Sequence, residues 1–580
     1  MSIITLLGVL LSVSSLSHAR LSDYFNWTSI EPTWSLRYTP CYEKYECARL
    51  LLPLDWLNVQ AAKDNDTIAL AVIKLPARVD VGDKSFGGTV IVNPGGPGDS
   101  GVTEILKNGH FLRNMVDGNL HFEVLSFDPR GMAHSTPVAD CYDSEVERTV
   151  ATWQNRGLGR FDESRGSFGQ QKALAAAFGR RCEYAEAQNP PIRKFMSSAS
   201  VARDMLEIVE QIELTKQSEL LSRSTRGKAQ QPLASTEVVK TARIQYYGTS
   251  YGTFLGNTFL SMFPGRVHRM ILDGVVVPEE WVEVDWRSNI IDTENAVEYF
   301  YKTCFEATSK CALWRDSDGS WKSIKARVDE MVDELDTNPL PVYAGNGVQT
   351  FLTGRDVLAT MGDPLYTPLD FFESLAVMLD DSLQGNHTRV LEQLGLSGQL
   401  DVCSPPSERR YDMTSAGIAN RCGDGKDVTG YGFAYWKSYT RELMARSPLF
   451  GYDVASTAFA CAGWTLRPKH RFDGPFTSPA ADARMRAGKP SAPLLLLSSF
   501  YDPITPLSSA HKVAKAHPGA RVVVQKSVGH CASLSAPSEC TNKIVRTYME
   551  TGQMPAAGVE CEPDCVPWKH CPHERARLPR

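Results

Sequence analysis

Short apolar runs and helical repeats alternate along the first half of the chain. Two early runs, residues 48–53 and 67–73, predict antiparallel strands at the start of a sheet. Four later apolar runs predict further buried strands: 88–93, 122–128, 241–247 and 269–273. Two segments predict helices: 200–214, which has a helical apolar period, and 253–262. Near-continuous apolar strands that alternate with helices are typical of a mostly parallel sheet covered on both faces.

This alternation stops after Val277 and resumes near the C-terminal end. Residues 278–486 predict a mainly helical region, and apolar strands return at 492–498 and 521–525, followed by a helix at 544–549. We interpret residues 20–277 and 487–560 as two parts of one α/β core. The helical region between them is a large cap inserted into the sheet, or alternatively a separate helical domain.

Charge and composition exclude some classes of protein. The 580 residues include 61 basic and 67 acidic ones, which gives a formal charge of −6. No long basic run is present, and the short one at 223–228 is interpreted as a solvated loop, so we expect no nucleic-acid partner. Ordinary globular composition argues against disorder.

The first residues suggest export. The apolar run 3–16 ends at Ser17-His18-Ala19, a pattern that suits signal peptidase, so residues 1–19 are predicted to be a signal peptide and the protein to be secreted. The lack of Lys and Arg before the run leaves a buried helix or a signal anchor as alternatives. No later stretch reaches about 18 apolar residues, so no membrane span is expected.

Fourteen cysteines fit the same route. Several are close in sequence, namely Cys41 with Cys47, Cys304 with Cys311, and Cys531 with Cys540, which favours disulfides in an oxidising compartment. Three sequons, at Asn26, Asn65 and Asn386, are candidate glycosylation sites. The Cys-rich tail 561–580 raises the alternative of a zinc site formed by its cysteines with His570 and His573. Its spacing matches no standard ligand pattern, so we expect no metal.

A serine in a sharp turn is the candidate nucleophile. Gly248-Thr249-Ser250-Tyr251-Gly252 follows a predicted strand and precedes a predicted helix. This context is the nucleophile elbow of the α/β-hydrolase fold, in which small residues two positions before and after the serine allow a strained turn that exposes its hydroxyl. The alternative is a structural glycine-rich turn.

The loop Asn93-Pro94-Gly95-Gly96-Pro97-Gly98 is a candidate oxyanion hole. In this fold the hole uses the backbone N–H after the nucleophile, here Tyr251, and one from a loop after an earlier strand. We assign the second donor to Gly96, with Gly95 as the alternative. A phosphate-binding loop is disfavoured because no Lys-Ser/Thr pair follows.

The acid and the base are expected after later strands. Asp502 follows the apolar strand 494–497 and is preferred as the acid over Asp273, whose following glycine and valines suit a structural turn. His530 follows the strand 522–524 and a glycine, which makes it the candidate base. The order Ser, Asp, His along the chain is the one that this fold requires.

Five spaced motifs carry a resemblance to a known family. They are Asn93-Pro-Gly-Gly-Pro-Gly, Asp128-Pro-Arg-Gly, Gly248-Thr-Ser-Tyr-Gly, Asp502-Pro-Ile-Thr-Pro and Gly529-His530-Cys531. Together with Cys461-Ala-Gly-Trp464 they resemble the secreted tripeptidyl-aminopeptidase branch of the prolyl-aminopeptidase family, over about residues 41–561. Three departures are Ala133 in place of a glycine, an apparent insertion at 222–235, and the cysteines of the tail.

The resemblance implies both disulfides and a reaction. It implies the pairs Cys41–Cys47, Cys304–Cys311 and Cys422–Cys461, and it makes Cys141–Cys182 plausible. It also implies a monomeric exopeptidase without a cofactor that releases short peptides from free N-termini. Such an enzyme needs carboxylates to hold the substrate ammonium, and six at the start of the cap are available: Glu279, Glu280, Glu283, Asp285, Asp292 and Glu294. A run of charges is often only a solvated helix face.

Two other functions stay open at this point. The same catalytic groups cleave esters and lactones, since acyl transfer proceeds through one kind of tetrahedral intermediate. An esterase or lactonase that acts on a small secreted metabolite is therefore the second hypothesis. A non-catalytic binding protein on a hydrolase scaffold is the third, and the intact set of Ser250, Asp502 and His530 disfavours it.

Overall fold

The computed structural model describes residues 25–64, 66–188, 191–224, 241–343, 349–396, 413–481, 489–569 and 571. The predicted signal peptide, Asn65, the basic run from residue 225 onward, most of the apparent insertion, His570 and His573 lie outside these residues.

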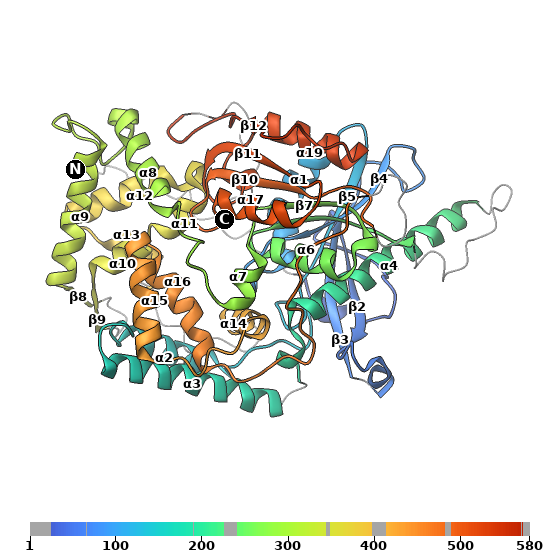
Figure 1. The fold of residues 1–580 in the computed structure, drawn as a ribbon, viewed down its shortest axis with the longest axis horizontal. Coiled ribbons are helices and arrows are strands. Elements are labelled where there is room, and N and C mark those ends of the chain that lie inside the picture. The colour runs from blue at the N-terminus through green and yellow to red at the C-terminus, as the bar shows by residue number, and fades with distance from the viewer. Residues whose placement is uncertain are drawn as a thin grey trace, which may run out of the picture.

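A ten-stranded sheet forms the centre of the molecule (Figure 1). Its order is β1-β2-β3-β5-β4-β6-β7-β10-β11-β12. The strands are β1 (Thr39–Cys41), β2 (Tyr45–Pro53), β3 (Thr67–Leu75), β4 (Phe86–Asn93), β5 (His121–Phe127), β6 (Ile244–Thr249), β7 (Val267–Asp273), β10 (Leu495–Tyr501), β11 (Arg521–Val528) and β12 (Glu560–Cys561). The pairs β1/β2, β2/β3 and β3/β5 are antiparallel and the others are parallel. The predicted strands and the mostly parallel sheet are confirmed.

Both faces of the sheet are buried, which explains the near-continuous apolar strands. Tyr246 and Tyr247 are both less than 2% exposed but belong to different apolar clusters, because successive side chains of a strand point to opposite faces. One face packs against α4 (Ser198–Ser224) and α6 (Tyr251–Met262), and the other against α1 (Gly101–Val116) and α19 (Glu539–Thr551).

The region between β7 and β10 is mainly helical, as predicted, and its yellow-green to orange helices gather on one side of the sheet in Figure 1. Its helices are α7 (Pro278–Glu283), α8 (Thr293–Ala307), α9 (Trp321–Thr337), α10 (Gly354–Ala359), α11 (Gly362–Tyr366), α12 (Pro368–Leu383), α13 (Thr388–Gln393), α14 (Met413–Asp424), α15 (Phe433–Arg446) and α16 (Gly451–Phe459). A short hairpin, β8 (Leu340–Tyr343) and β9 (Gln349–Leu352), lies among them.

Two helices from the N-terminal half join this cap. They are α2 (Glu145–Arg156) and α3 (Arg165–Gln188), which run beneath α15 and α16 in Figure 1. Arg156 forms an ion pair with Asp356 at 2.8 Å, and the Phe161 ring stacks on Phe459 at 4.2 Å between centroids. The predicted core range 20–277 therefore contains a segment that packs with the cap.

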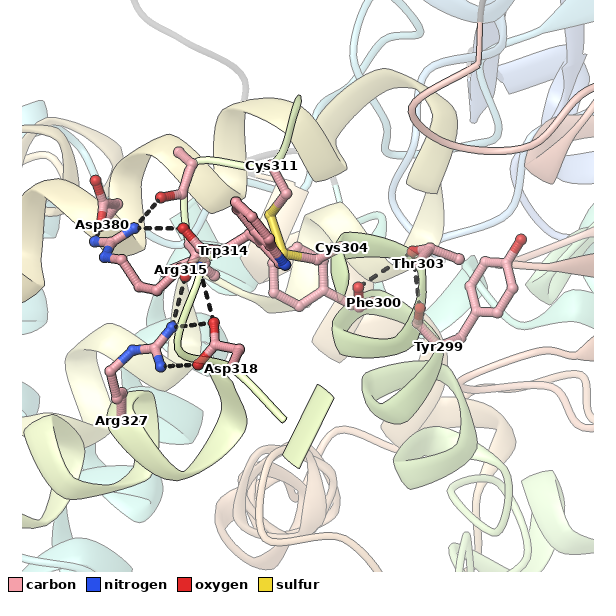
Figure 2. The surroundings of a disulfide bond; sticks show 12 residues. Tyr299, Phe300, Thr303, Cys304, Cys311, Trp314, Arg315, Asp318, Arg327 and Asp380 are labelled. Carbon is pink, nitrogen blue, oxygen red and sulfur yellow. Dashed lines mark hydrogen bonds and ion pairs between the residues drawn. A yellow bond between two sulfur atoms is a disulfide. The ribbon is translucent and has the colours of Figure 1, made fainter. Parts of the chain in front are cut away.

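The four predicted disulfides are all present: Cys41–Cys47, Cys141–Cys182, Cys304–Cys311 and Cys422–Cys461. The first of the two inside the cap closes a turn after α8, near the ion pairs Arg315–Asp380 and Arg327–Asp318 (Figure 2). Because the bridge joins this turn to α8 and the ion pairs join it to α9 and α12, the cap is cross-linked internally.

The sequence proximity of Cys531 and Cys540 was misleading. Cys540 pairs with Cys561, and Cys565 pairs with Cys571, whereas Cys531 is a buried free thiol. The tail cysteines considered for zinc are therefore joined in disulfides. No helix within the described part of the chain is long and apolar enough to cross a membrane.

Candidate active site

Ser250 lies between β6 and α6 in a strained backbone conformation. Its φ of 55° and ψ of −127° fall in a region that side chains rarely adopt, as expected for the elbow that lifts a nucleophile above the sheet. The Ser250 N–H donates to the carbonyl of Asp273 at 3.0 Å, and its carbonyl accepts from Thr253 N–H at 2.8 Å. These bonds on both sides hold the strained residue in place.

Asp502 and His530 form a buried pair after β10 and β11. His530 Nδ1 lies 3.0 and 3.1 Å from the two carboxylate oxygens of Asp502, which also accept N–H bonds from Ile504, Thr505 and Cys531. Burial alone would raise the pKa of Asp502, but the interaction with His530 and the backbone N–H groups outweigh it, so this pKa lies below its ordinary value.

This pairing fixes which nitrogen of His530 is free to accept a proton. An ionised carboxylate only accepts hydrogen bonds, so Nδ1 carries the hydrogen and Nε2 of the neutral ring has a lone pair. Nε2 is buried and has no partner among the described residues. The residue after His530 lies close to the elbow, since the Cys531 thiol donates at 3.4 Å to the Asp273 carbonyl, which also accepts from the Ser250 N–H.

The cap contacts the histidine directly. The ring of Tyr366, at the end of α11, meets the His530 ring edge-on at 4.7 Å between centroids, and the Tyr366 carbonyl accepts from His530 N–H at 2.9 Å. Sequence reasoning missed this contact, because nothing in the local pattern of α11 points to a residue 164 positions further along the chain.

Asp273, the alternative acid, has a different set of partners. Its carboxylate accepts hydrogen bonds from Tyr247 Oη at 2.8 Å, from Ala532 N–H at 2.6 Å and from both the N–H and the hydroxyl of Ser533. These donors anchor the segment after His530, while the imidazole itself is bonded to Asp502. The preference for Asp502 agrees with this geometry.

The candidate oxyanion loop lies against the elbow. A Cβ added to Gly95, whose φ is +106°, would stand 2.9 Å from the Ser250 Cβ and 2.8 Å from the Thr249 carbonyl, so only glycine fits there. The Gly95 N–H donates to Asn93 Oδ1 at 3.2 Å, whereas the Gly96 N–H, like that of Gly98, has no partner among the described residues. Tyr251 N–H lies at the first position of α6, where an intrahelical acceptor is absent.

The Asp128-Pro-Arg-Gly motif supports this loop from below. Asp128 Oδ1 accepts from Ser100 Oγ at 2.6 Å and from Val102 N–H at 3.1 Å, at the start of α1 directly after the loop. Arg130 is fully buried and pairs with Asp204 of α4. The motif therefore holds the loop and the helices that flank it.

Tyr251 links the elbow to the cap through its side chain. Its hydroxyl lies 2.5 Å from Ser198 Oγ, which lies 2.6 Å from Asp424 Oδ2 at the end of α14. Burial raises the pKa of Asp424 to about 6, and the hydrogen bonds from Ser198 only partly offset this. A titratable carboxyl of the cap thus lies two hydrogen bonds from a candidate oxyanion-hole residue.

Most of the cap carboxylates considered for the substrate ammonium have protein partners. Glu280 pairs with Lys512, Glu283 with Lys426 and Asp285 with Arg287, and Glu294 accepts from Ser447. Glu279 is exposed. Asp292 is the one that lies near the candidate catalytic residues. Burial raises the pKa of its carboxyl, and the charge of Asp502 raises it further.

Sequence reasoning missed two further carboxylates near the set of Ser250, Asp502 and His530. Burial raises the pKa of Asp99, and the charges of Lys107 and His530 act against this rise. Burial and the charge of Asp99 also raise the pKa of Glu104 to about 7. Asp99 follows the oxyanion loop directly and Glu104 lies in the first turn of α1, so their nearness to the loop is the signal that could have identified them.

A cavity of about 420 Å³ opens beside the oxyanion loop. Its walls are Gly96 and Pro97 on one side and the cap helices α14 and α16 with Ala460 on the other. This cavity gives the candidate site a space for part of a substrate.

Comparison with known proteins agrees with this geometry. Residues 447–561 match a family described as TAP-like protein. The chain is 22% identical over 549 residues to the tripeptidyl aminopeptidase of Streptomyces lividans, which covers 93% of this chain and 87% of that protein. It is 24% identical to serine protease Hip1 of Mycobacterium tuberculosis, covering 89% and 87%, and 25% identical to carboxylesterase B of the same organism, covering 89% and 86%. The resemblance expected from the motifs is confirmed.

Proposed function

We propose that this chain, a serine hydrolase with the α/β-hydrolase fold, is a secreted exopeptidase that releases short peptides or amino acids from free N-termini. One observation carries the proposal: the buried Asp502–His530 pair presents an Nε2 that has no partner among the described residues, in a site whose neighbouring elbow holds Ser250 in a strained turn. Acyl transfer needs a serine, a base with a free lone pair and an acid that orients the base.

In the proposed mechanism His530 Nε2 removes the proton from Ser250 Oγ as the oxygen attacks the substrate carbonyl. Asp502 stabilises the imidazolium, and the N–H groups of Gly96 and Tyr251 donate to the oxyanion of the tetrahedral intermediate. His530 then gives its proton to the leaving amine, which leaves an acyl group on Ser250. A water molecule deprotonated by His530 releases this acyl group in the second half of the reaction.

Carboxylates near the triad support a preference for free amines. Asp99 and Glu104, which follow the oxyanion loop, and Asp292, at the start of α8, are only partly exposed and form no ion pair within the described residues. The charge of Lys107 offsets only part of the effect of burial on Asp99 and Glu104, so a substrate ammonium would add a favourable positive charge. We therefore propose that this acidic group faces the N-terminus of the peptide.

The disulfides and the sequons support export. Six disulfides within the described residues are typical of an oxidising compartment. Asn26 and Asn386 are exposed, as glycosylation requires. Glycosylation of both residues and cleavage of a signal peptide after residue 19 are part of the proposal.

Esterase activity is the second candidate, because one relative is named carboxylesterase B and the same catalytic groups cleave esters. The two functions are separated by assaying the secreted protein on aminoacyl and tripeptidyl arylamides, with free and acetylated N-termini, beside short p-nitrophenyl esters. Amide turnover confined to free amines supports the exopeptidase. Ester turnover without amide turnover would contradict it, and Ser250→Ala serves as the inactive control.

A further inference from the structure

The cavity beside the oxyanion loop has a positively charged side chain in its lining. Its wall from α14 contains Arg421, and none of the described residues that line it is an Asp or a Glu. The cap helix comes very close to the loop here, since a Cβ added to Gly417 would stand 2.6 Å from the Pro97 carbonyl. Arg421 follows Gly417 by four residues and so lies one turn further along the same face of α14.

The Arg421 guanidinium has no anionic partner among the described residues. Burial lowers its pKa to about 10, with no nearby carboxylate to offset the change. At neutral pH it is still charged. Its contact is the ring of Trp286, whose centroid lies 5.6 Å away. Neighbouring cap arginines differ, because Arg467 donates to three backbone carbonyls and Arg471 pairs with Asp473.

A second donor in the same cavity also lacks a partner. Ser456 Oγ, from α16 on the opposite wall, is buried and makes no hydrogen bond within the described chain. Its neighbour Thr457 is satisfied, since its hydroxyl donates to the Asp453 carbonyl at 2.8 Å. A buried hydroxyl and a partly buried guanidinium that both lack acceptors are costly, and one bound anion would satisfy both.

We propose that this cavity receives a carboxylate of the substrate, which pairs with Arg421 and accepts a hydrogen bond from Ser456. The inference deepens the proposed function, since it rests on the same site and defines part of its substrate class. The carboxylate has two possible sources, the C-terminus of a short peptide or an Asp or Glu side chain near the scissile bond. Both present the planar anion that a guanidinium binds through two parallel bonds.

The test measures binding without turnover. In the Ser250→Ala background, calorimetry compares a tetrapeptide acid with its C-terminal amide, and a Glu-containing peptide amide with its Gln counterpart. We expect one of the two acidic members to bind about tenfold to a hundredfold more tightly than its neutral partner. Which pair shows the difference identifies the source of the carboxylate.

Adding Arg421→Gln should remove the difference and leave the affinity for the neutral peptides unchanged. Arg421→Lys should restore part of it, because the charge returns without the planar fork. Arg389→Gln is the matched control, as it removes the same charge from the exposed Arg389 of α13, which pairs with Asp381 of α12. Melting temperatures confirm that each variant is folded, and Arg421→Gln should melt close to its parent because it loses only the contact with the Trp286 ring.

Equal affinity for acidic and neutral peptides, or a preference that survives Arg421→Gln, would overturn the inference. Neither result touches the proposed peptidase activity, which is read separately from arylamide turnover by the unsubstituted enzyme. Conversely, an Arg421-dependent preference for carboxylates supports the inference even if the arylamides are not cleaved.

Discussion

At the scale of single residues, two buried aspartates near the base are distinguished by what they bond. Asp502 accepts from the imidazole of His530, whereas Asp273 accepts from Tyr247, Ala532 and Ser533 and anchors the segment that follows the base. The first arrangement orients a proton acceptor. The second holds the backbone that carries it.

Substitution of each aspartate by asparagine should separate these roles. Asp502→Asn should lower kcat on the order of 10⁴-fold, because the imidazole loses its orienting acceptor, and it should also lower the melting temperature, because an amide group would face the N–H groups of Ile504, Thr505 and Cys531. Asp273→Asn should destabilise the fold by about 2 to 4 kcal/mol, since an amide group would again face several buried donors, but with a much smaller loss of kcat in the protein that remains folded. The measurements are kcat per fluorophosphonate-reactive site and thermal unfolding. If Asp273→Asn gave the larger loss of kcat at full folding, the assignment of the acid would be wrong.

Sequence reasoning found the residues whose function has a local signature. Ser250 sits in a glycine-flanked turn, and Asp502 and His530 each follow an apolar strand. Tyr366, Ser198 and Asp424 contact the candidate site only because distant segments pack together, and no local pattern encodes such contacts. Arg421 was missed for the same reason, since its proposed role comes from the absence of an anionic partner among the described residues around it.

At the scale of elements, α14 is the connection between cap and core. Its Gly417 lies against Pro97 of the oxyanion loop, and its Asp424 bonds Ser198 at the start of α4, which in turn contacts Tyr251. Movement of this helix would therefore act on the oxyanion loop and on the elbow together.

The raised pKa of Asp424 predicts a pH-dependent junction. The folded value of about 6 exceeds the ordinary value of about 3.9 expected in the unfolded chain, so the folded state binds this proton more tightly. The resulting stabilisation is complete below about pH 4 and is lost as the pH rises through 6. Relative to Asp424→Asn, which does not titrate, the wild-type free energy of unfolding should fall by about 2 to 3 kcal/mol between pH 4 and 7. Denaturant unfolding across this range checks it, and a difference that stays constant with pH would contradict it.

The Cys422–Cys461 disulfide should hold the cavity walls together. It joins α14 to the segment that follows α16, and the two cysteines are 39 positions apart in sequence. Replacing both cysteines by serine should cost about 3 to 4 kcal/mol of stability, from the loop entropy that the bridge removes in the unfolded chain. The replacement should also weaken the binding of peptide acids more than the binding of peptide amides, because Arg421 adjoins Cys422. Unfolding and binding measurements on the double variant test this, with Cys41 and Cys47 replaced as the control pair.

At the scale of the whole molecule, sequence reasoning predicted the layers of the fold more accurately than the boundary between core and cap. The apolar strands of the core were found because burial on both faces leaves few polar positions. The packing of α2 and α3 against the cap was not found, because it depends on contacts such as Arg156–Asp356 between segments 200 residues apart. The free thiol of Cys531 was likewise not predicted, because Cys531 lies close in sequence to Cys540, which pairs with Cys561 instead.

Export through an oxidising compartment should leave the cysteines in a specific pattern of disulfides and free thiols. A non-reducing peptide map should recover the six disulfides of the described chain, and Cys531 should resist alkylation until the protein unfolds, since burial raises the pKa of its thiol well above the usual value. Free thiols at Cys422 and Cys461 in the secreted protein would count against the oxidising compartment.

The most direct test of the central claim is to locate the acyl group during turnover. The enzyme is quenched in acid while it cleaves a tripeptidyl arylamide with a free N-terminus, and tandem mass spectrometry maps the modified residue. We predict a tripeptide ester on Ser250 that is absent from the Ser250→Ala protein and from reactions with the N-acetylated substrate. An acyl group on another residue, or equal acylation of Ser250 by the blocked substrate, would contradict the proposed exopeptidase.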